Sequence, residues 1–151
     1  MKASLIILLL SIAFLTIPVC FKIDDDVPEP KKPGESGCGP NSGETTVSFQ
    51  KDIQKPILNG ICAKCHSGSD ASGDMDLSEG FSYCNIYNKK SSGYSPDIRV
   101  VPGNSEASVL YGKIINTGEW GGKMPPAGAG SLSDTEINNI KTWIDEGAID
   151  N

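Results

Sequence analysis

The sequence predicts an all-α domain with long irregular connections. Two segments, residues 47–61 and 132–148, repeat their apolar side chains at helical spacing, and the stretches between them are rich in glycine, serine and aspartate. Apolar residues three or four apart fall on one face of a helix, which can then pack against a core. A chain of 151 residues with a compositionally biased N-terminal third has room for one domain of about 100 residues.

The first predicted helix covers residues 47–61. Its apolar residues follow one another at i, i+4 spacing and are Phe49, Ile53, Ile57 and Ile61. Ser48 is the expected N-cap, because a serine hydroxyl accepts hydrogen bonds from the free N–H groups of a first turn. Pro56 lies inside the pattern, and we expect it to kink the helix or divide it in two.

A short motif follows this helix directly, since residues 62–66 read Cys-Ala-Lys-Cys-His. Two cysteines at positions i and i+3 can reach the two vinyl groups of one porphyrin, and the next histidine lies beneath the iron as its proximal ligand. The motif therefore predicts a c-type haem bound covalently through Cys62 and Cys65, with His66 as an iron ligand.

Two other interpretations of the cysteine pair are a thiol redox site and half of a zinc site. A thiol redox pair is expected beside a strand-helix-strand pattern, which this sequence does not show. A structural zinc ion normally takes four protein ligands, and no second histidine or second close cysteine pair completes the set. We therefore favour haem attachment.

The sixth position of the iron needs a ligand other than imidazole, because His66 is the only histidine. Met124 is held in the glycine-rich stretch 118–126 and is followed by two prolines. A proline excludes the helical region for the residue before it, so this thioether is expected to project from a stiff turn. A thioether is a soft ligand that raises the reduction potential of a haem. Met75 is the rival candidate, but it follows His66 by only nine residues (75 − 66) and is better explained as a gap-filling core residue.

Two helices are expected between the attachment motif and Met124. A short one is predicted near residues 82–87, inside a glycine- and serine-rich loop. The turn at 100–103 leads into the other, with Asn104 or Ser105 as its cap and its end near 116–118.

Residues 132–148 carry a strong helix signal. Ser133 and Glu136 form a capping box, and Gly147 supplies the stop. We expect this last helix to pack across the first one.

The N-terminal part of the chain predicts export. A lysine at position 2 precedes an apolar run too short to span a membrane comfortably, which indicates a signal peptide over residues 1–20, and the alternative is a retained signal anchor. Cys20 stands where a bacterial lipoprotein has its lipid-acceptor cysteine, although the three residues before it lack the usual small side chain. Residues 21–44, rich in proline, glycine and aspartate, predict a solvated tether, and 45–151 the folded domain.

The remaining cysteines suggest one anchor and one bridge. Five cysteines less the two of the motif leave Cys20, Cys38 and Cys84. If Cys20 is lipidated, Cys38 and Cys84 are left to form a disulfide. The alternative for Cys84 is a buried apolar side chain.

The net charge of −6 excludes one class of partner. Binding of nucleic acid needs a basic face, which this composition does not offer. A partner that is steered electrostatically should be basic where it docks.

In their joint order, these motifs resemble a small monohaem cytochrome c of class I type. The similarity covers about residues 47–148 and rests on the run Phe-x-x-x-Ile-x-x-x-Ile-Leu, the attachment motif, a Val-Pro-Gly-Asn turn, the Met-Pro-Pro loop and the closing helix. The resemblance implies a cytochrome c-like fold of about three to four helices around one covalently bound haem c. It also implies thioether anchors at Cys62 and Cys65, and axial ligands at His66 and Met124.

The function implied by this resemblance is single-electron transfer without a substrate, so no enzymatic activity is expected. Expected partners are redox proteins of a respiratory or periplasmic electron-transfer chain, with the domain in the periplasm or cell envelope on a lipid anchor. The alternatives are a haem-based sensor or enzyme in which Met124 dissociates, and an anchoring module whose haem is incidental. The stretch at 87–97 is an insertion relative to the family and leaves the surface at the haem edge undefined.

Overall fold

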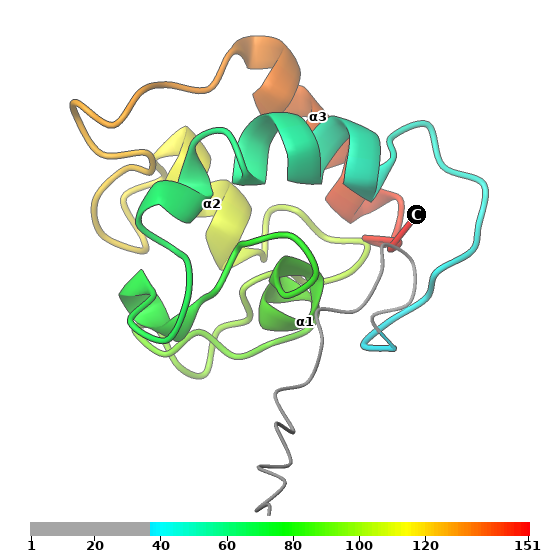
Figure 1. Ribbon diagram of the computed structural model, residues 1–151, viewed down its shortest axis with the longest axis horizontal. Helices are drawn as coiled ribbons and strands as arrows, with labels where there is room; N and C mark the ends of the chain where they lie inside the picture. Colours follow the sequence, from blue (N-terminus) through cyan, green and yellow to red (C-terminus); the bar gives the residue numbers. More distant parts are fainter. Residues whose placement is uncertain (1–36) are drawn as a thin grey trace, which may run out of the picture.

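The computed structural model describes residues 37–151 and shows a helical domain with long loops (Figure 1). The predicted signal peptide, Cys20 and most of the predicted tether lie outside the described residues. No strand occurs within 37–151, which contains only isolated bridges such as Tyr87 with Val100. The all-α prediction is confirmed for this part of the chain. In chain order its helical segments are η1 (Phe49–Leu58), η2 (Cys62–Lys64), η3 (Ser72–Asp74), α1 (Ser82–Ile86), α2 (Val109–Ile115) and α3 (Asp134–Asp145).

The first helix, η1, begins where the sequence predicts. The Ser48 hydroxyl accepts a hydrogen bond from the N–H of Lys51 at 3.3 Å, so the predicted N-cap is confirmed. The apolar stripe is buried, with less than 2% of each side chain exposed at Phe49, Ile53 and Ile57. This face fixes the helix on the core and so fixes the start of the segment that follows it.

Pro56 does not divide η1, which continues through it as a π-helix. The N–H of Asn59 donates to the carbonyl of Gln54 at 2.9 Å, which is an i→i+5 hydrogen bond. A proline ring collides with the carbonyl four residues earlier in an α-helix, and a wider turn moves that carbonyl aside. The widened helix therefore accommodates Pro56 where we expected a kink or a break.

The last helix, α3, shows the predicted capping box. The Ser133 hydroxyl accepts from the N–H of Glu136 at 3.3 Å, and the Glu136 carboxylate accepts from the N–H of Ser133 at 2.8 Å. Gly147 follows the helix with a φ of +101°, a backbone conformation that other residues rarely adopt.

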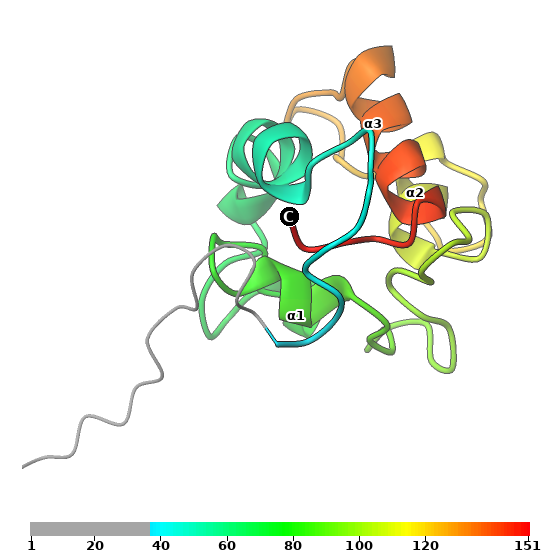
Figure 2. The same cartoon turned by 90° about the vertical axis from the view of Figure 1, so that its right-hand side faces the viewer.

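The core lies where α3 packs against η1 and α2 (Figures 1 and 2). The fully buried Trp143 of α3 contacts Phe49 of η1 at a ring-centroid distance of 5.0 Å. Phe49 in turn meets Tyr83 of α1 edge to face at 5.2 Å. The prediction that the last helix packs across the first is confirmed.

The helix α2 begins later than expected. Its N-cap is Ser108, so the prediction of Asn104 or Ser105 as cap is wrong. These two residues belong to a preceding turn, in which the Asn104 side chain accepts from the N–H of Ala107 at 3.1 Å. The N–H of Ser105 donates to Asp145 of α3 at 2.9 Å. The turn is therefore used to dock on α3, and the helix starts only after it.

The segment before η1 is joined to the domain. A disulfide links Cys38 to Cys84 of α1, with a Cα–Cα distance of 5.3 Å. The N–H of Asp150 donates to the carbonyl of Pro40 at 2.9 Å, so this segment runs beside the C-terminal residues (Figure 2). The Glu146 carboxylate accepts from the N–H of Thr46 at 3.0 Å. These contacts extend the folded unit back to residue 38.

Candidate haem site

The attachment motif forms one tight turn at the end of η1. The carbonyl of Cys62 accepts from the N–H groups of both Cys65 and His66, at 3.2 and 3.1 Å. The two thiols are free, with Cys62 half-buried and Cys65 exposed. The turn thus presents two available sulfurs and an imidazole from five consecutive residues.

Cys62 lies in an environment that favours a neutral sulfur. Burial, together with the nearby carboxylate of Glu136, raises the pKa of the Cys62 thiol to about 11. Redox-active and zinc-binding cysteines react or bind as thiolates, which this environment disfavours. A thioether carries no charge at any pH and therefore suits the site.

His66 is oriented by a backbone carbonyl. Its Nδ1 lies 2.6 Å from the carbonyl oxygen of Ser72, in the short helix η3. A carbonyl only accepts hydrogen bonds, so Nδ1 carries the proton and Nε2 keeps its lone pair. The loop between them is closed by two further hydrogen bonds, from Ser72 N–H to Cys65 carbonyl at 3.1 Å and from Leu77 N–H to His66 carbonyl at 2.8 Å. Such an outer hydrogen bond fixes the ring and its tautomer in metal-ligating histidines generally.

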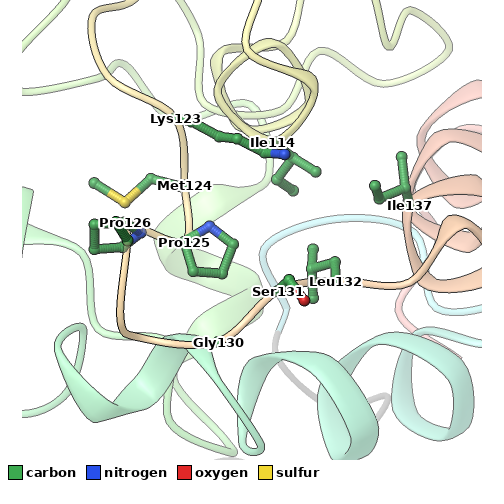
Figure 3. Close-up of a pocket in the computed structure, with 10 residues that line it drawn as sticks. Ile114, Lys123, Met124, Pro125, Pro126, Gly130, Ser131, Leu132 and Ile137 are labelled. Atoms are coloured by element: carbon green, nitrogen blue, oxygen red, sulfur yellow. The ribbon is translucent and has the colours of Figure 1, made fainter.

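Met124 lies on a separate loop between α2 and α3. Its N–H donates to the carbonyl of Lys113 in α2 at 2.9 Å, and its side chain is half-buried. Beside it lies a pocket of about 280 Å³, shown in Figure 3. Ile114 of α2 and Ile137 of α3 face this pocket, with Pro125 and Leu132 on the connecting loop. The lining is predominantly apolar, as the flat face of a porphyrin requires.

The first turn of α3 connects the two parts of the site. The carboxylate of Glu136 helps to raise the pKa of the Cys62 thiol, whereas the next residue, Ile137, lines the pocket beside Met124. Two thiols, an oriented imidazole and a thioether beside an apolar pocket fit a covalently bound haem. Met75, the rival ligand, packs against the core cluster, as a gap-filling residue does.

The sequence predicted the ligand candidates and missed the residues that position them. The acceptor at Ser72 is a backbone carbonyl, which no side-chain pattern reveals. Lys113 holds the Met124 loop from the last turn of α2, and only its place on that helix is visible in the sequence. Cys38 and Cys84 form their disulfide at α1, and Cys20 lies outside the described residues.

The helical domain and the arrangement of these residues fit the cytochrome c class, and a comparison with protein families supports the same class. A family model matches residues 62–128, from the first cysteine of the motif through the Met124 loop, and this match supports a cytochrome c domain in that part of the chain. The matching family is described as Planctomycete cytochrome C, which implies a covalently bound haem c.

Comparisons with whole proteins add a distant similarity. No curated protein matches the chain. Among solved structures, the chain is similar to Hydrazine Synthase of Kuenenia stuttgartiensis at 26% identity and a TM-score of 0.49. The similarity covers 70% of this chain and 16% of that one, so the chain spans a small part of its length. None of the helices within 37–151 has the length and apolar character needed to cross a membrane.

Proposed function

We propose that this domain transfers single electrons through one haem, bound covalently by Cys62 and Cys65 and ligated axially by His66 and Met124. The observation that carries the proposal is the 2.6 Å contact between His66 Nδ1 and the Ser72 carbonyl oxygen. It leaves Nε2 as the free lone-pair donor, on the same turn as two free thiols.

Different residues of the chain would hold different parts of the haem. A haem supplies a reversible one-electron couple when it is bound. Cys62 and Cys65 anchor it at one edge, and His66 presents Nε2 in a fixed orientation. Ile114 and Ile137 supply apolar surface to the pocket that Met124 also lines. A thioether exchanges no proton on oxidation or reduction, and it raises the reduction potential relative to a second nitrogen ligand.

Two measurements on the purified protein test this proposal: its absorption spectrum before and after reduction, and its intact mass. We expect the mass of one attached haem and a low-spin spectrum with a sulfur-to-iron band in the ferric state. The band should disappear in Met124→Ala and persist in Met75→Ala, which removes the other candidate sulfur. A high-spin spectrum, or a band that survives in Met124→Ala, would contradict His/Met ligation.

Binding of carbon monoxide separates a carrier from a sensor or enzyme with a dissociable methionine. A resident Met124 occupies the position that an external ligand needs, so the ferrous protein should bind carbon monoxide slowly. Met124→Ala should bind it rapidly. Rapid binding by the unmodified protein would count against the carrier.

We also propose that the domain works in the periplasm or cell envelope, attached to a membrane by a lipid on Cys20. The disulfide between Cys38 and Cys84 supports an oxidising compartment outside the cytoplasm. Mass spectrometry of protein extracted from membranes should find a lipid on Cys20, and Cys20→Ala should move the protein to the soluble fraction. An unmodified Cys20 in the processed, membrane-bound protein would refute the anchor.

The proposed partners are redox proteins of a respiratory or periplasmic chain. The net charge of −6 favours a partner with a basic docking face. Electron exchange with such a partner should slow as salt is added, because screening weakens the attraction. A rate that does not depend on salt would argue against this mode of docking.

A further inference from the structure

The ammonium group of Lys113 holds the loop that carries Met124. Nζ donates to the carbonyl of Trp120 at 2.8 Å, to the carbonyl of Gly122 at 3.1 Å and to the hydroxyl of Tyr94 at 3.1 Å. An ammonium has three protons, so all of its donors are used. The backbone carbonyl of the same residue accepts from Met124 N–H at 2.9 Å. One lysine therefore contacts the loop at three points, the last of them the proposed ligand itself.

The insertion at 87–97 also contacts this loop and the lysine that holds it. The Trp120 indole N–H donates to the carboxylate of Asp97 at 2.8 Å. The Lys113 ammonium lies 5.0 Å from the centroid of the Tyr94 ring, within range of a cation–π interaction. Tyr94 and Asp97 both belong to the stretch for which the cytochrome pattern gave no role. The Tyr94 hydroxyl accepts from Lys113, and the Asp97 carboxylate accepts from Trp120 of the Met124 loop.

The loop needs such a brace because of its composition. Glycines stand at 118, 121 and 122, and each has more backbone freedom to lose on ordering than any other residue type. A neutral thioether adds no charge attraction of its own to hold it in place. The fraction of time that Met124 spends in position therefore depends on contacts made by other residues.

We propose that Lys113 is a positioning residue that, supported by Tyr94 and Asp97 of the 87–97 insertion, keeps Met124 in place as the axial ligand. This inference rests on the proposed haem ligation. The alternative is that Lys113 stabilises the fold as a whole and leaves the occupancy of Met124 unchanged.

The test compares Lys113→Met with Lys55→Met in the haem-loaded protein. Lys55 is an exposed residue of η1, so its replacement makes the same change in charge away from the loop. Methionine keeps the length of the lysine side chain and removes its donors. Losing hydrogen bonds from a charged donor should raise the rate of carbon monoxide binding by the ferrous protein about tenfold or more. The sulfur-to-iron band should weaken in parallel, and Lys55→Met should match the unmodified protein in both.

Two further variants separate positioning from general stability. Lys113→Arg, which keeps a charged group with several donors, should recover part of the band. Tyr94→Phe removes one acceptor and keeps the ring, so it should give a smaller increase in the same rate. Because Tyr94→Phe alters a single hydroxyl, it also decides the question if Lys113→Met does not fold. Hydrogen exchange at the Met124 amide should speed up in Lys113→Met and in Tyr94→Phe.

The outcomes distinguish this inference from the function on which it rests. If the unmodified protein lacks the sulfur-to-iron band, Met124 is not a ligand and the proposed function fails. If the unmodified protein has the band, and Lys113→Met binds carbon monoxide at the same rate as the unmodified protein, Met124 remains a ligand and the positioning role is overturned. If Lys113→Met does not fold, the rate in Tyr94→Phe decides in the same way. If Lys113→Met loses thermal stability but keeps the sulfur-to-iron band and the rate of carbon monoxide binding, Lys113 stabilises the fold and does not position Met124.

Discussion

The attachment turn and the Met124 loop are held in place by different kinds of contact. In the attachment turn, Cys62, His66 and Ser72 are joined mainly through backbone groups a few residues apart. The Met124 loop is held by Lys113 of the preceding helix and also by side chains from more distant positions, since Tyr94 lies 19 residues before Lys113, and Asp97 lies 23 before Trp120. One half of the proposed site folds locally, whereas the other depends on tertiary structure.

This difference fits what each half has to do. The proposed haem attachment joins two sulfurs permanently, and the turn that presents them is held by hydrogen bonds within its own short sequence. The contact with a thioether is reversible, and its strength is set by how firmly the loop is held. Changes in distant residues should therefore alter the Met124 side of the site and leave the attachment side intact.

Removal of the disulfide should give the largest loss of stability and leave both regions unchanged. Cys38 and Cys84 are 46 residues apart in sequence, and opening a loop of this size costs about 2–4 kcal/mol of unfolding free energy. Urea denaturation of the haem-loaded Cys38→Ser/Cys84→Ser protein should show this loss, with an unchanged ferric spectrum. A weakened sulfur-to-iron band in this variant would show that the disulfide also supports the Met124 loop.

Gly112→Ala should disturb the Met124 loop selectively. A Cβ at Gly112 would overlap the ring of Trp120, which packs on α2 at this point. Alanine is better than glycine inside a helix by about 1 kcal/mol, but such overpacking typically costs about 1–3 kcal/mol. We expect a net loss of stability and a weaker band, with the mass of the covalently bound haem unchanged.

Gly122→Ala is the matched control for this change. A Cβ at Gly122 meets nothing within 4 Å, and the carbonyl that accepts from Lys113 is retained. This variant should keep the full sulfur-to-iron band. Equal effects of the two substitutions would indicate that loop flexibility, and not the position of Trp120, governs the ligand.

The same division explains how much the sequence could predict. The Ser48 cap and the capping box of Ser133 are local patterns, and the sequence identifies them correctly. The motif at 62–66 is equally local, and its role in haem attachment stays a prediction. The predicted start of α2 was wrong because the N–H of Ser105 donates to Asp145 of α3, a tertiary contact with no local signal. The π-helical passage through Pro56 was also missed, since the choice between a kink and a wider turn depends on the burial of the stripe on both sides.

The Met124 loop shows the same limit inside the site. A methionine before a proline in a glycine-rich stretch suggests a ligand, but Lys113 looks like any basic residue in the last turn of a helix. Its acceptors include two backbone carbonyls, which leave no trace in a residue pattern. The sequence therefore suggests Met124 as the proposed ligand, whereas it gives no sign of the residues that hold the Met124 loop.

Ser133→Ala should affect both regions slightly, because the first turn of α3 connects them. Loss of the N-cap should lower the unfolding free energy by about 1 kcal/mol. Glu136 beside Cys62 and Ile137 beside Met124 lie in this turn, so its fraying should weaken the band modestly. Thr135→Ala, an exposed change in the same turn without a capping role, should have a smaller effect on urea denaturation and on the spectrum. A spectral change in the control alone would contradict the role given to the cap.

Ser72→Ala should have the smallest effect, and its comparison with Ser72→Pro tests the attachment turn most directly. His66 contacts the carbonyl oxygen of Ser72 and not its hydroxyl, so Ser72→Ala should change stability by less than about 0.5 kcal/mol and leave the haem spectrum as it is. Ser72→Pro is the sharper comparison, because it removes the N–H that donates to Cys65 at 3.1 Å. The preceding Ala71 has a φ of −55° and a ψ of 128°, which a following proline tolerates, so the lost hydrogen bond is the main change. If the haem spectrum changes in Ser72→Pro and not in Ser72→Ala, the backbone of residue 72 sets the orientation of His66. A changed spectrum in Ser72→Ala would mean that the Ser72 side chain sets it.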